Sequence, residues 1–139
     1  MSAIEVDLRL RSPHWSRVRT SDDTTIDGNG LRVRADTGCS DPTDPEVLAS
    51  HPGRLAAIRI DGDEVVLAQD RLRSWPLFWS LENGPDGARR LVISDDATLM
   101  REAVSAPRLD ARARREFLDA GFVTGSDTLL AGIHQTEQG

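Results

Sequence analysis

Apolar and polar positions alternate along the first ten residues, where apolar side chains occupy every second position from Ile4 to Leu10, and the same period recurs over residues 31–35. Side chains of a strand point alternately to its two faces, so both segments are predicted to be strands with one buried face. Turn-forming residues lie between them and include Asn29-Gly30, a strong hairpin signal. The N-terminal third is therefore predicted to be a β-meander.

Longer apolar runs predict two further hairpins. Residues 55–60 and 64–68 flank a Gly-containing turn, and their nearly continuous apolarity favours burial on both faces. Residues 77–81 and 91–93 flank the polar loop 82–87. At least six strands are therefore predicted.

A short helix is predicted over residues 43–48, where a capping residue and Pro45 precede apolar positions. Its end is expected near residues 51–53. The polar residue before the proline, Asp44, is of a type that commonly caps helices.

Two more helices are predicted near the C-terminus. Ser94 is expected to cap the first, which carries acidic residues in its first turn and ends before Pro107. The second begins at residues 109–110 and ends at Gly121. The first helix has an apolar stripe of Leu99, Met100, Ala103 and Val104. The second has recurring apolar residues and two predicted i,i+4 ion pairs: Ala113, Phe117 and Leu118; Asp110 with Arg114, and Arg115 with Asp119. Hairpins followed by helices indicate the α+β class.

Length and composition narrow the functional classes. The 139 residues suit one domain, and a net charge of -6 argues against a nucleic-acid partner. No apolar run reaches the roughly 20 residues that a membrane span needs, and the N-terminus lacks the pattern of a signal peptide, so we expect a cytoplasmic protein with no membrane partner. Cys39, His14, His51 and His134 are too far apart for a recognisable metal motif, so we expect no metal site.

The run from Ala68 to Trp79 resembles the asparagine synthetase family of class II glutamine amidotransferases. In that family a strand ending in Ala-Arg-Asp is followed by Arg-Leu-Gly and then by Pro-Leu-Tyr-Tyr; here the run reads Ala-Gln-Asp-Arg-Leu-Arg-Ser-Trp-Pro-Leu-Phe-Trp. Gln69 replaces the usual Arg and Arg73 the usual Gly, which raises the question of whether the family's local turn is kept.

The likeness extends to about half of the chain. Ile93-Ser94-Asp95 is similar to the family's Ala-Ser-Glu before a helix, and residues 43–48 are similar to its Ser-Asp-Thr-Glu-Val-Leu. The family's interdomain pattern is matched further on by Leu109-Asp110, Phe117-Leu118, Gly121-Phe122-Val123, Gly125, Thr128-Leu129, Gly132-Ile133 and Gly139.

This resemblance implies a shortened four-layer α/β/β/α sandwich of the N-terminal-nucleophile type, with residues 1–139 forming a type 2 glutamine amidotransferase-like domain. Active members expose a mature N-terminal Cys at position 2, whose thiol attacks glutamine. This chain has Ser2, and the family's Asn-Gly-Glu oxyanion loop and carboxylate-binding Arg are not found in context. Asp44 alone matches a glutamine-binding position.

The implied function is that of a glutaminase-inactive domain working beside an ATP-dependent synthetase, as in β-lactam synthetases and lasso-peptide cyclases. ATP and Mg²⁺ would be bound by that partner, because this chain lacks the family's pyrophosphate loop and needs no cofactor of its own. The partner would adenylate a carboxylate of an amino-acid or peptide substrate and form an intramolecular amide. The contact surface is expected to include residues 122–133.

Two alternatives from other classes remain open. In the first, Met1 is removed and Ser2 acts as the nucleophile of a hydrolase or amidotransferase. In the second, Asp44 binds the ammonium group of an amino acid in a binding module. We favour a chain without a catalytic residue over one in which Ser2 is the nucleophile. For Asp44 we favour a helix cap over a ligand role.

Several other side chains have structural interpretations that we prefer. Trp75, Phe78 and Trp79 are predicted to serve packing, with Phe78 and Trp79 pointing to opposite faces of a strand. Arg71 and Arg73 are predicted to pair with surface carboxylates rather than to bind anions.

Overall fold

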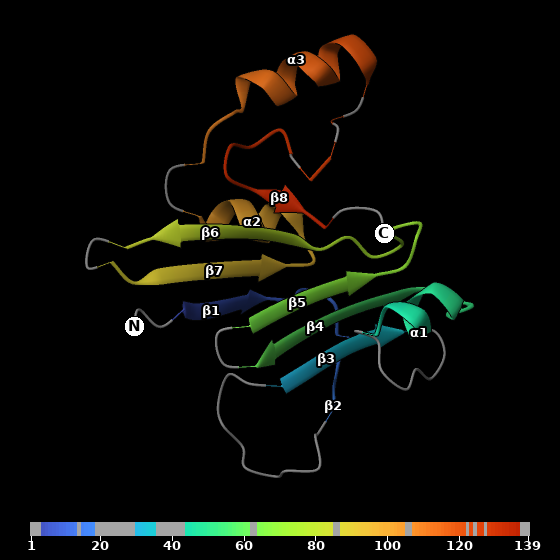
Figure 1. Cartoon of the computed structure of the whole chain (residues 1–139). Coiled ribbons are helices and arrows are strands. Elements are labelled where there is room, and N and C mark those ends of the chain that lie inside the picture. The colour runs from blue at the N-terminus through green and yellow to red at the C-terminus, as the bar shows by residue number, and fades with distance from the viewer. Residues whose placement is uncertain are drawn as a thin grey trace. The chain divides into compact units, whose positions relative to one another are not determined.

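The computed structural model describes residues 4–13, 15–18, 30–35, 44–61, 64–84, 87–104, 107–121, 123, 125–126 and 128–136. The described elements comprise three helices and eight strands in two sheets, so the chain is of the mixed α+β class (Figure 1). In chain order they are β1 (Ile4–Arg9), β2 (Ser16–Val18), β3 (Gly30–Ala35), α1 (Pro45–Ser50), β4 (Leu55–Asp61), β5 (Glu64–Gln69), β6 (Phe78–Asn83), β7 (Arg89–Ser94), α2 (Ala97–Ala103), α3 (Ala111–Ala120) and β8 (His134–Gln135).

The chain divides into two compact units. The first comprises Met1–Arg11 and Phe78–Glu137, and the second comprises Ser12–Leu77 and Gln138–Gly139. Sheet order is β1-β7-β6-β8 in the first unit and β2-β3-β4-β5 in the second. Each unit therefore has a sheet of its own.

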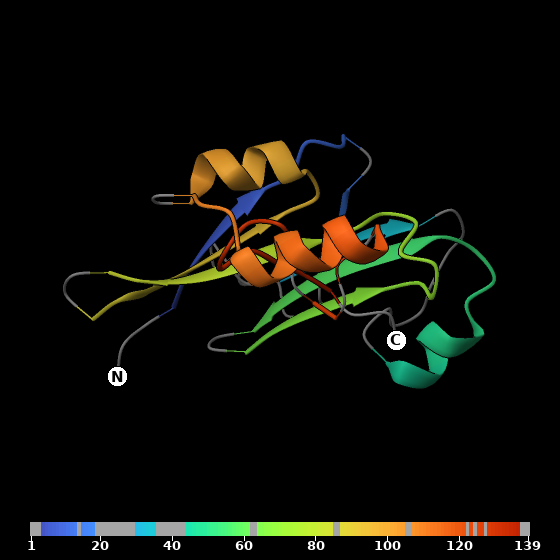
Figure 2. The ribbon, with the colours of Figure 1, turned by 90° about the horizontal axis from the view of Figure 1, so that it is seen from above.

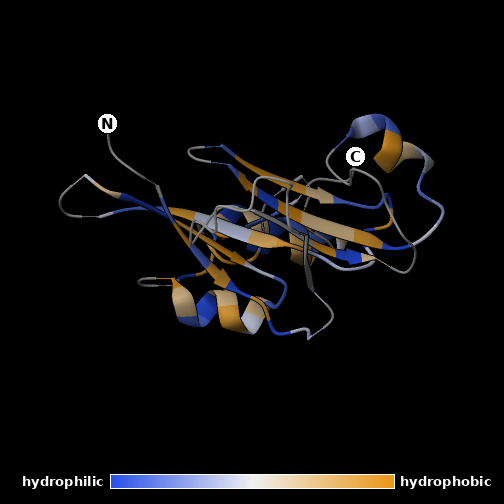
Figure 3. Ribbon diagram, turned by 90° about the horizontal axis from the view of Figure 1, so that it is seen from below, coloured by the Kyte–Doolittle hydropathy of each residue, from blue (hydrophilic) through white to orange (hydrophobic). Residues whose placement is uncertain are grey.

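In the second unit, β4 is the most deeply buried strand. Leu55, Ala56, Ala57 and Ile58 are all 0% exposed, which confirms burial on both faces of this strand. β5 is fully buried only near its end, at Ala68 and Gln69. The two strands form the predicted antiparallel hairpin, and Figure 3 shows apolar residues along the strands.

In the first unit, α2 packs on the sheet across β7, β1 and β6, and Figure 2 shows it crossing over β1. Its Met100, at 0% exposure, joins Val92 and Ile133 in a buried cluster. Phe78 packs against this cluster from β6. Helix and sheet thus share one apolar core.

In the first unit, Arg90 of β7 links β1, β6 and α2 through polar contacts. Its guanidinium forms ion pairs with Asp7 of β1 and with Glu82 of β6, the latter at 3.3 Å, and it donates to the Ala103 carbonyl of α2 at 3.0 Å. Hydrogen bonds from Arg9, opposed by burial and aided by Arg90, hold the pKa of Asp7 below its ordinary value.

The structure corrects three predictions. The N-terminal third is not a β-meander, because β1 pairs in parallel with β7, leaving β2 and β3 as an antiparallel pair in the other sheet. The predicted Asn-Gly turn begins at residue 29, outside the described residues. Ser94 is not the cap of α2: it ends β7, and Asp96 caps the helix by accepting the Thr98 and Leu99 amides.

The third correction concerns α3, whose ends fall as predicted but whose charges pair differently. Asp110 caps the helix by accepting the Ala113 amide at 2.9 Å, while the i,i+4 ion pair joins Arg112 to Glu116. Gly121 ends the helix with φ +80°, a conformation that costs glycine no side-chain clash. None of the described helices has the length and apolarity needed to cross a membrane.

Candidate functional site

The strand-to-turn segment after β5 is built around the carboxylate of Asp70. One oxygen, Oδ2, accepts the Leu55 amide at 3.1 Å, and the Asp70 amide in turn donates to the Leu55 carbonyl at 2.9 Å. The other oxygen accepts the Leu72 amide at 2.9 Å and the Ser74 hydroxyl at 3.0 Å. This side chain therefore joins the start of β4 to the turn that leaves β5.

These hydrogen bonds determine the direction in which the pKa of Asp70 is shifted. Burial by itself raises the pKa of the carboxyl, but the hydrogen bonds donated by Leu55, Ser74 and Leu72 outweigh it and lower the pKa below its ordinary value. The charged form is thus the one that the fold stabilises. The partners that hold it are three backbone amides and one hydroxyl.

The turn closes through an unusual backbone conformation at Arg73. Its φ is +50°, and it is the only residue other than glycine with positive φ in the described part of the chain. This is the position at which the asparagine synthetase motif has Gly. The Arg73 amide donates to the Asp70 carbonyl at 3.1 Å, so the turn closes with a residue other than glycine in a conformation that glycine adopts without strain.

The aromatic residues of the motif have separate surroundings. Trp75 contacts two guanidinium groups, with Arg34 Cζ at 4.1 Å and Arg54 Cζ at 4.7 Å from its ring centre. Trp79 and Phe78 point to opposite faces of β6, as predicted: Phe78 meets the Met100 cluster, and Trp79 stacks on His134 with ring centres 4.5 Å apart.

Backbone bonds between residues 108–110 and residues 129–131 hold the segment that precedes α3. Leu109 and Leu130 form a β-bridge, the Asp110 amide donates to the Leu129 carbonyl at 2.8 Å, and the Ala131 amide donates to the Arg108 carbonyl at 2.8 Å. These bonds fasten the segment before the helix to residues near position 130. The C-terminal pattern therefore positions α3.

The turn that follows is organised by Thr128. Its hydroxyl donates to the Ile133 carbonyl at 2.8 Å and accepts the Leu130 amide at 3.2 Å. Gly132 has φ +76°, and Ile133 returns to the core with 4% exposure. Each of these residues has a local structural role.

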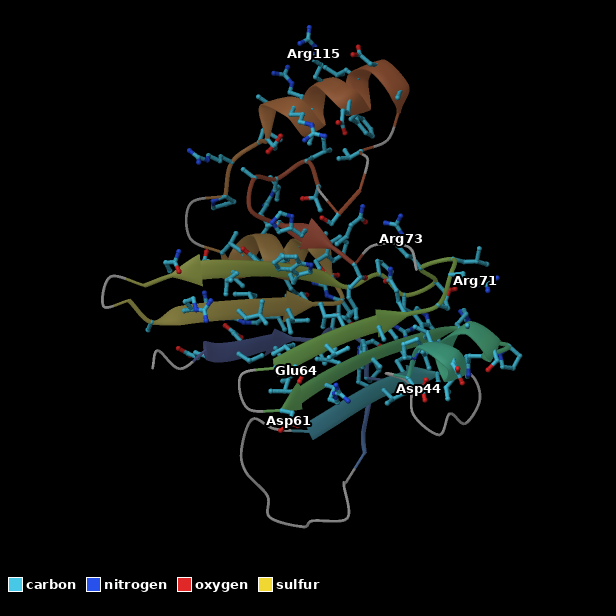
Figure 4. The ribbon with its side chains drawn as sticks, viewed as in Figure 1. Asp44, Asp61, Glu64, Arg71, Arg73 and Arg115 are labelled. Carbon is cyan, nitrogen blue, oxygen red and sulfur yellow. The ribbon has the colours of Figure 1, made fainter. Side chains whose placement is uncertain are left out.

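The remaining predicted site residues are widely distributed. Asp44 caps α1 by accepting the Glu46 amide at 2.9 Å, which confirms the cap interpretation (Figure 4). Ser2, His14, Cys39 and Phe122 lie outside the described residues. His51 and His134 fall in different compact units, and no group of three or more His, Cys, Asp or Glu side chains suited to a metal ion occurs in the part of the chain that the structure describes.

Arg71 and Arg73 were expected to pair with surface carboxylates. Arg73 makes no ion pair within the described ranges, and its contribution to the turn is its backbone. Figure 4 shows the two arginines beside the turn that follows β5. Sequence reasoning missed the structural role of Asp70, although its place in the motif and the turn residues after it were available signals.

Comparison with known proteins identifies no relative: no protein-family model, no curated protein and no solved structure matches the chain.

We predict that Asp70→Asn lowers the free energy of unfolding by about 1–3 kcal/mol, because an amide has only one oxygen to offer to the partly buried Leu55 amide and Ser74 hydroxyl. The folded state lowers the pKa of Asp70, so its contribution is present above the unfolded pKa of about 3.9 and is lost as pH falls through the lowered folded value. Urea unfolding of both proteins across the acidic range measures this. An equal pH dependence for the two would contradict the role of the charge.

We predict the opposite sign for Arg73→Gly, which should raise the free energy of unfolding by about 0.5–1 kcal/mol. Glycine removes the strain at positive φ, and this gain exceeds the cost of the greater conformational freedom that glycine has in the unfolded chain. Arg71→Gly is the matched control in the same turn. It offers no such relief and should lose stability. A loss in both variants, measured as chemical denaturation midpoints, would show that Arg73 is not strained.

Proposed function

We propose that this chain is a glutaminase-inactive, asparagine-synthetase-like N-terminal domain that supports an ATP-dependent amide-forming synthetase. Its architecture would be the shortened four-layer sandwich of the N-terminal-nucleophile class. The content of two four-stranded sheets with helices in each unit supports this fold.

The observation that carries the proposal is that the matched motif residues perform structural tasks. Asp70 holds a turn, Asp44 and Asp110 cap helices, and Thr128 organises the segment below α3. A domain that no longer hydrolyses glutamine but still presents a surface to a partner would retain these structural residues and would not need the nucleophile. Ser2 in place of Cys agrees with that selection.

Helix α3 offers such a surface. Phe117 and Leu118 of the helix are 46% and 70% exposed, and Leu109, just before it, is 61% exposed, which is high for large apolar side chains. Arg114 and Arg115 make no ion pair within the described residues, and Arg115 projects outward from the helix (Figure 4). A partner surface with an apolar centre and flanking carboxylates would complement this face, so the contact region extends from residues 122–133 to α3.

In this account the partner carries the chemistry. It binds ATP and Mg²⁺, adenylates a carboxylate of an amino-acid or peptide substrate and closes an amide with an amine of the same substrate, so no ammonia is required. Such reactions occur in lasso-peptide and β-lactam biosynthesis. The present domain stabilises the partner's working conformation through binding energy.

The test is ATP–pyrophosphate exchange by a purified asparagine-synthetase-type ATP domain, measured with and without this chain. Addition of the chain should raise the substrate-dependent exchange rate. Leu118→Glu should weaken the stimulation by about tenfold or more, because it places a charge in the apolar centre of the interface.

The matched control is Leu72→Glu, which alters a leucine that is 82% exposed in the other compact unit. It should leave the stimulation unchanged. No stimulation by the unaltered chain would contradict the proposed function, whereas equal loss in both variants would contradict the assignment of the contact surface to α3.

A further inference from the structure

A surface pocket of about 370 Å³ lies within the first compact unit. It is formed by residues of β6, by Val104, Pro107 and Arg108, and by the turn before β8; β6 and β8 are labelled in Figure 1. Its volume lies within the range typical of small-molecule sites. The residues that line it are Ser80, Leu81, Glu82, Val104, Pro107, Arg108, Ala131 and Gly132.

The pocket lining combines opposite charges with apolar walls. Glu82 contributes a carboxylate and Arg108 a guanidinium, while most of the other lining side chains are aliphatic. From these groups we infer that the pocket binds a free α-amino acid with an apolar side chain. The ammonium of the ligand pairs with Glu82, its carboxylate pairs with Arg108, and its side chain lies against the aliphatic wall.

Glu82 is held in place before any ligand arrives. Its Oε2 lies 3.3 Å from Arg90 Nη1, and Arg90 is itself fixed by Asp7 and by the Ala103 carbonyl. Only 23% of the Glu82 side chain is exposed. A fixed and partly desolvated carboxylate attracts an ammonium group more strongly than one that moves freely in water.

Arg108 supplies the opposite charge from a rigid piece of backbone. Its carbonyl accepts the Ala131 amide at 2.8 Å, and the next residue, Leu109, bridges to Leu130. The Arg108 side chain makes no ion pair within the described residues, so a ligand carboxylate would not have to displace another acid. A guanidinium can bind a carboxylate through two parallel hydrogen bonds.

Ser80 is the third polar group of the lining. The residue is only 4% exposed and contributes to the lining of the pocket. Its hydroxyl can donate to the ligand carboxylate or accept from the ammonium.

This inference is independent of the proposed function, and it differs from amino-acid binding through Asp44. Asp44 lies in the other compact unit and uses its carboxylate to cap α1. The two sites can therefore be separated by substitution.

Isothermal titration calorimetry of the purified chain with L-leucine tests the inference, beside L-leucinamide, which lacks the carboxylate, and N-acetyl-L-leucine, which lacks the ammonium. Leucine should bind at least about tenfold more tightly than either analogue, since leucinamide offers no carboxylate to Arg108 and N-acetyl-leucine offers no ammonium to Glu82. L-valine and L-phenylalanine extend the comparison to other apolar side chains. Absence of binding by all three amino acids at millimolar concentration would overturn the inference.

Substitutions assign the site. Arg108→Ala changes an exposed residue without an ion pair, so the fold should survive, and leucine affinity should fall about tenfold or more while leucinamide binding stays unchanged. Arg115→Ala on α3, outside the pocket, and Asp44→Ala should both retain wild-type affinity. Equal affinity in Arg108→Ala and the wild-type chain, or loss in Asp44→Ala alone, would contradict the assignment to this pocket.

Discussion

The carboxylate of Asp70 is the constraint on which the second unit depends. It satisfies donors at the start of β4 and within the turn after β5 at the same time. These donors are backbone amides and a hydroxyl, groups that are costly to leave without a partner. Because Asp70 also exchanges a backbone hydrogen bond with Leu55, it fixes where the β4–β5 pair ends and where the chain turns towards Leu77, itself 0% exposed.

Asp70 supplies most of the side-chain hydrogen bonds of this turn, and the turn accommodates Arg73 at positive φ with only a local strain. Near α3, the side chains of Asp110 and Thr128 also bond to the backbone. In both places a side chain satisfies backbone groups that would otherwise be unpaired.

Local chemistry made much of the fold predictable. The α1 cap, the α3 stop at Gly121 and the β4–β5 hairpin each depend on residues close together in the sequence. The pairing of β1 with β7 was not predictable in this way, because it joins segments more than 80 positions apart and has no turn signal. Ser94 and Asp96 are both good caps, and the length of β7 decides between them.

The candidate sites also differ in whether they could be predicted from local sequence. Asp44 and Asp70 could be singled out from a local motif, and the structure shows what their carboxylates hold. The pocket could not be anticipated, because Glu82 and Arg108 meet only after β6, α2 and the turn before β8 have packed together. It arises from tertiary structure alone.

The central claim is that the chain keeps a glutaminase scaffold without glutaminase chemistry. Ammonia release from L-glutamine by the purified chain, whose N-terminus has been defined by intact mass, tests it most directly. We expect no release above the buffer rate, whether or not Met1 has been removed. Sustained turnover that requires loss of Met1 and disappears in Ser2→Ala would contradict the account and identify an N-terminal serine nucleophile.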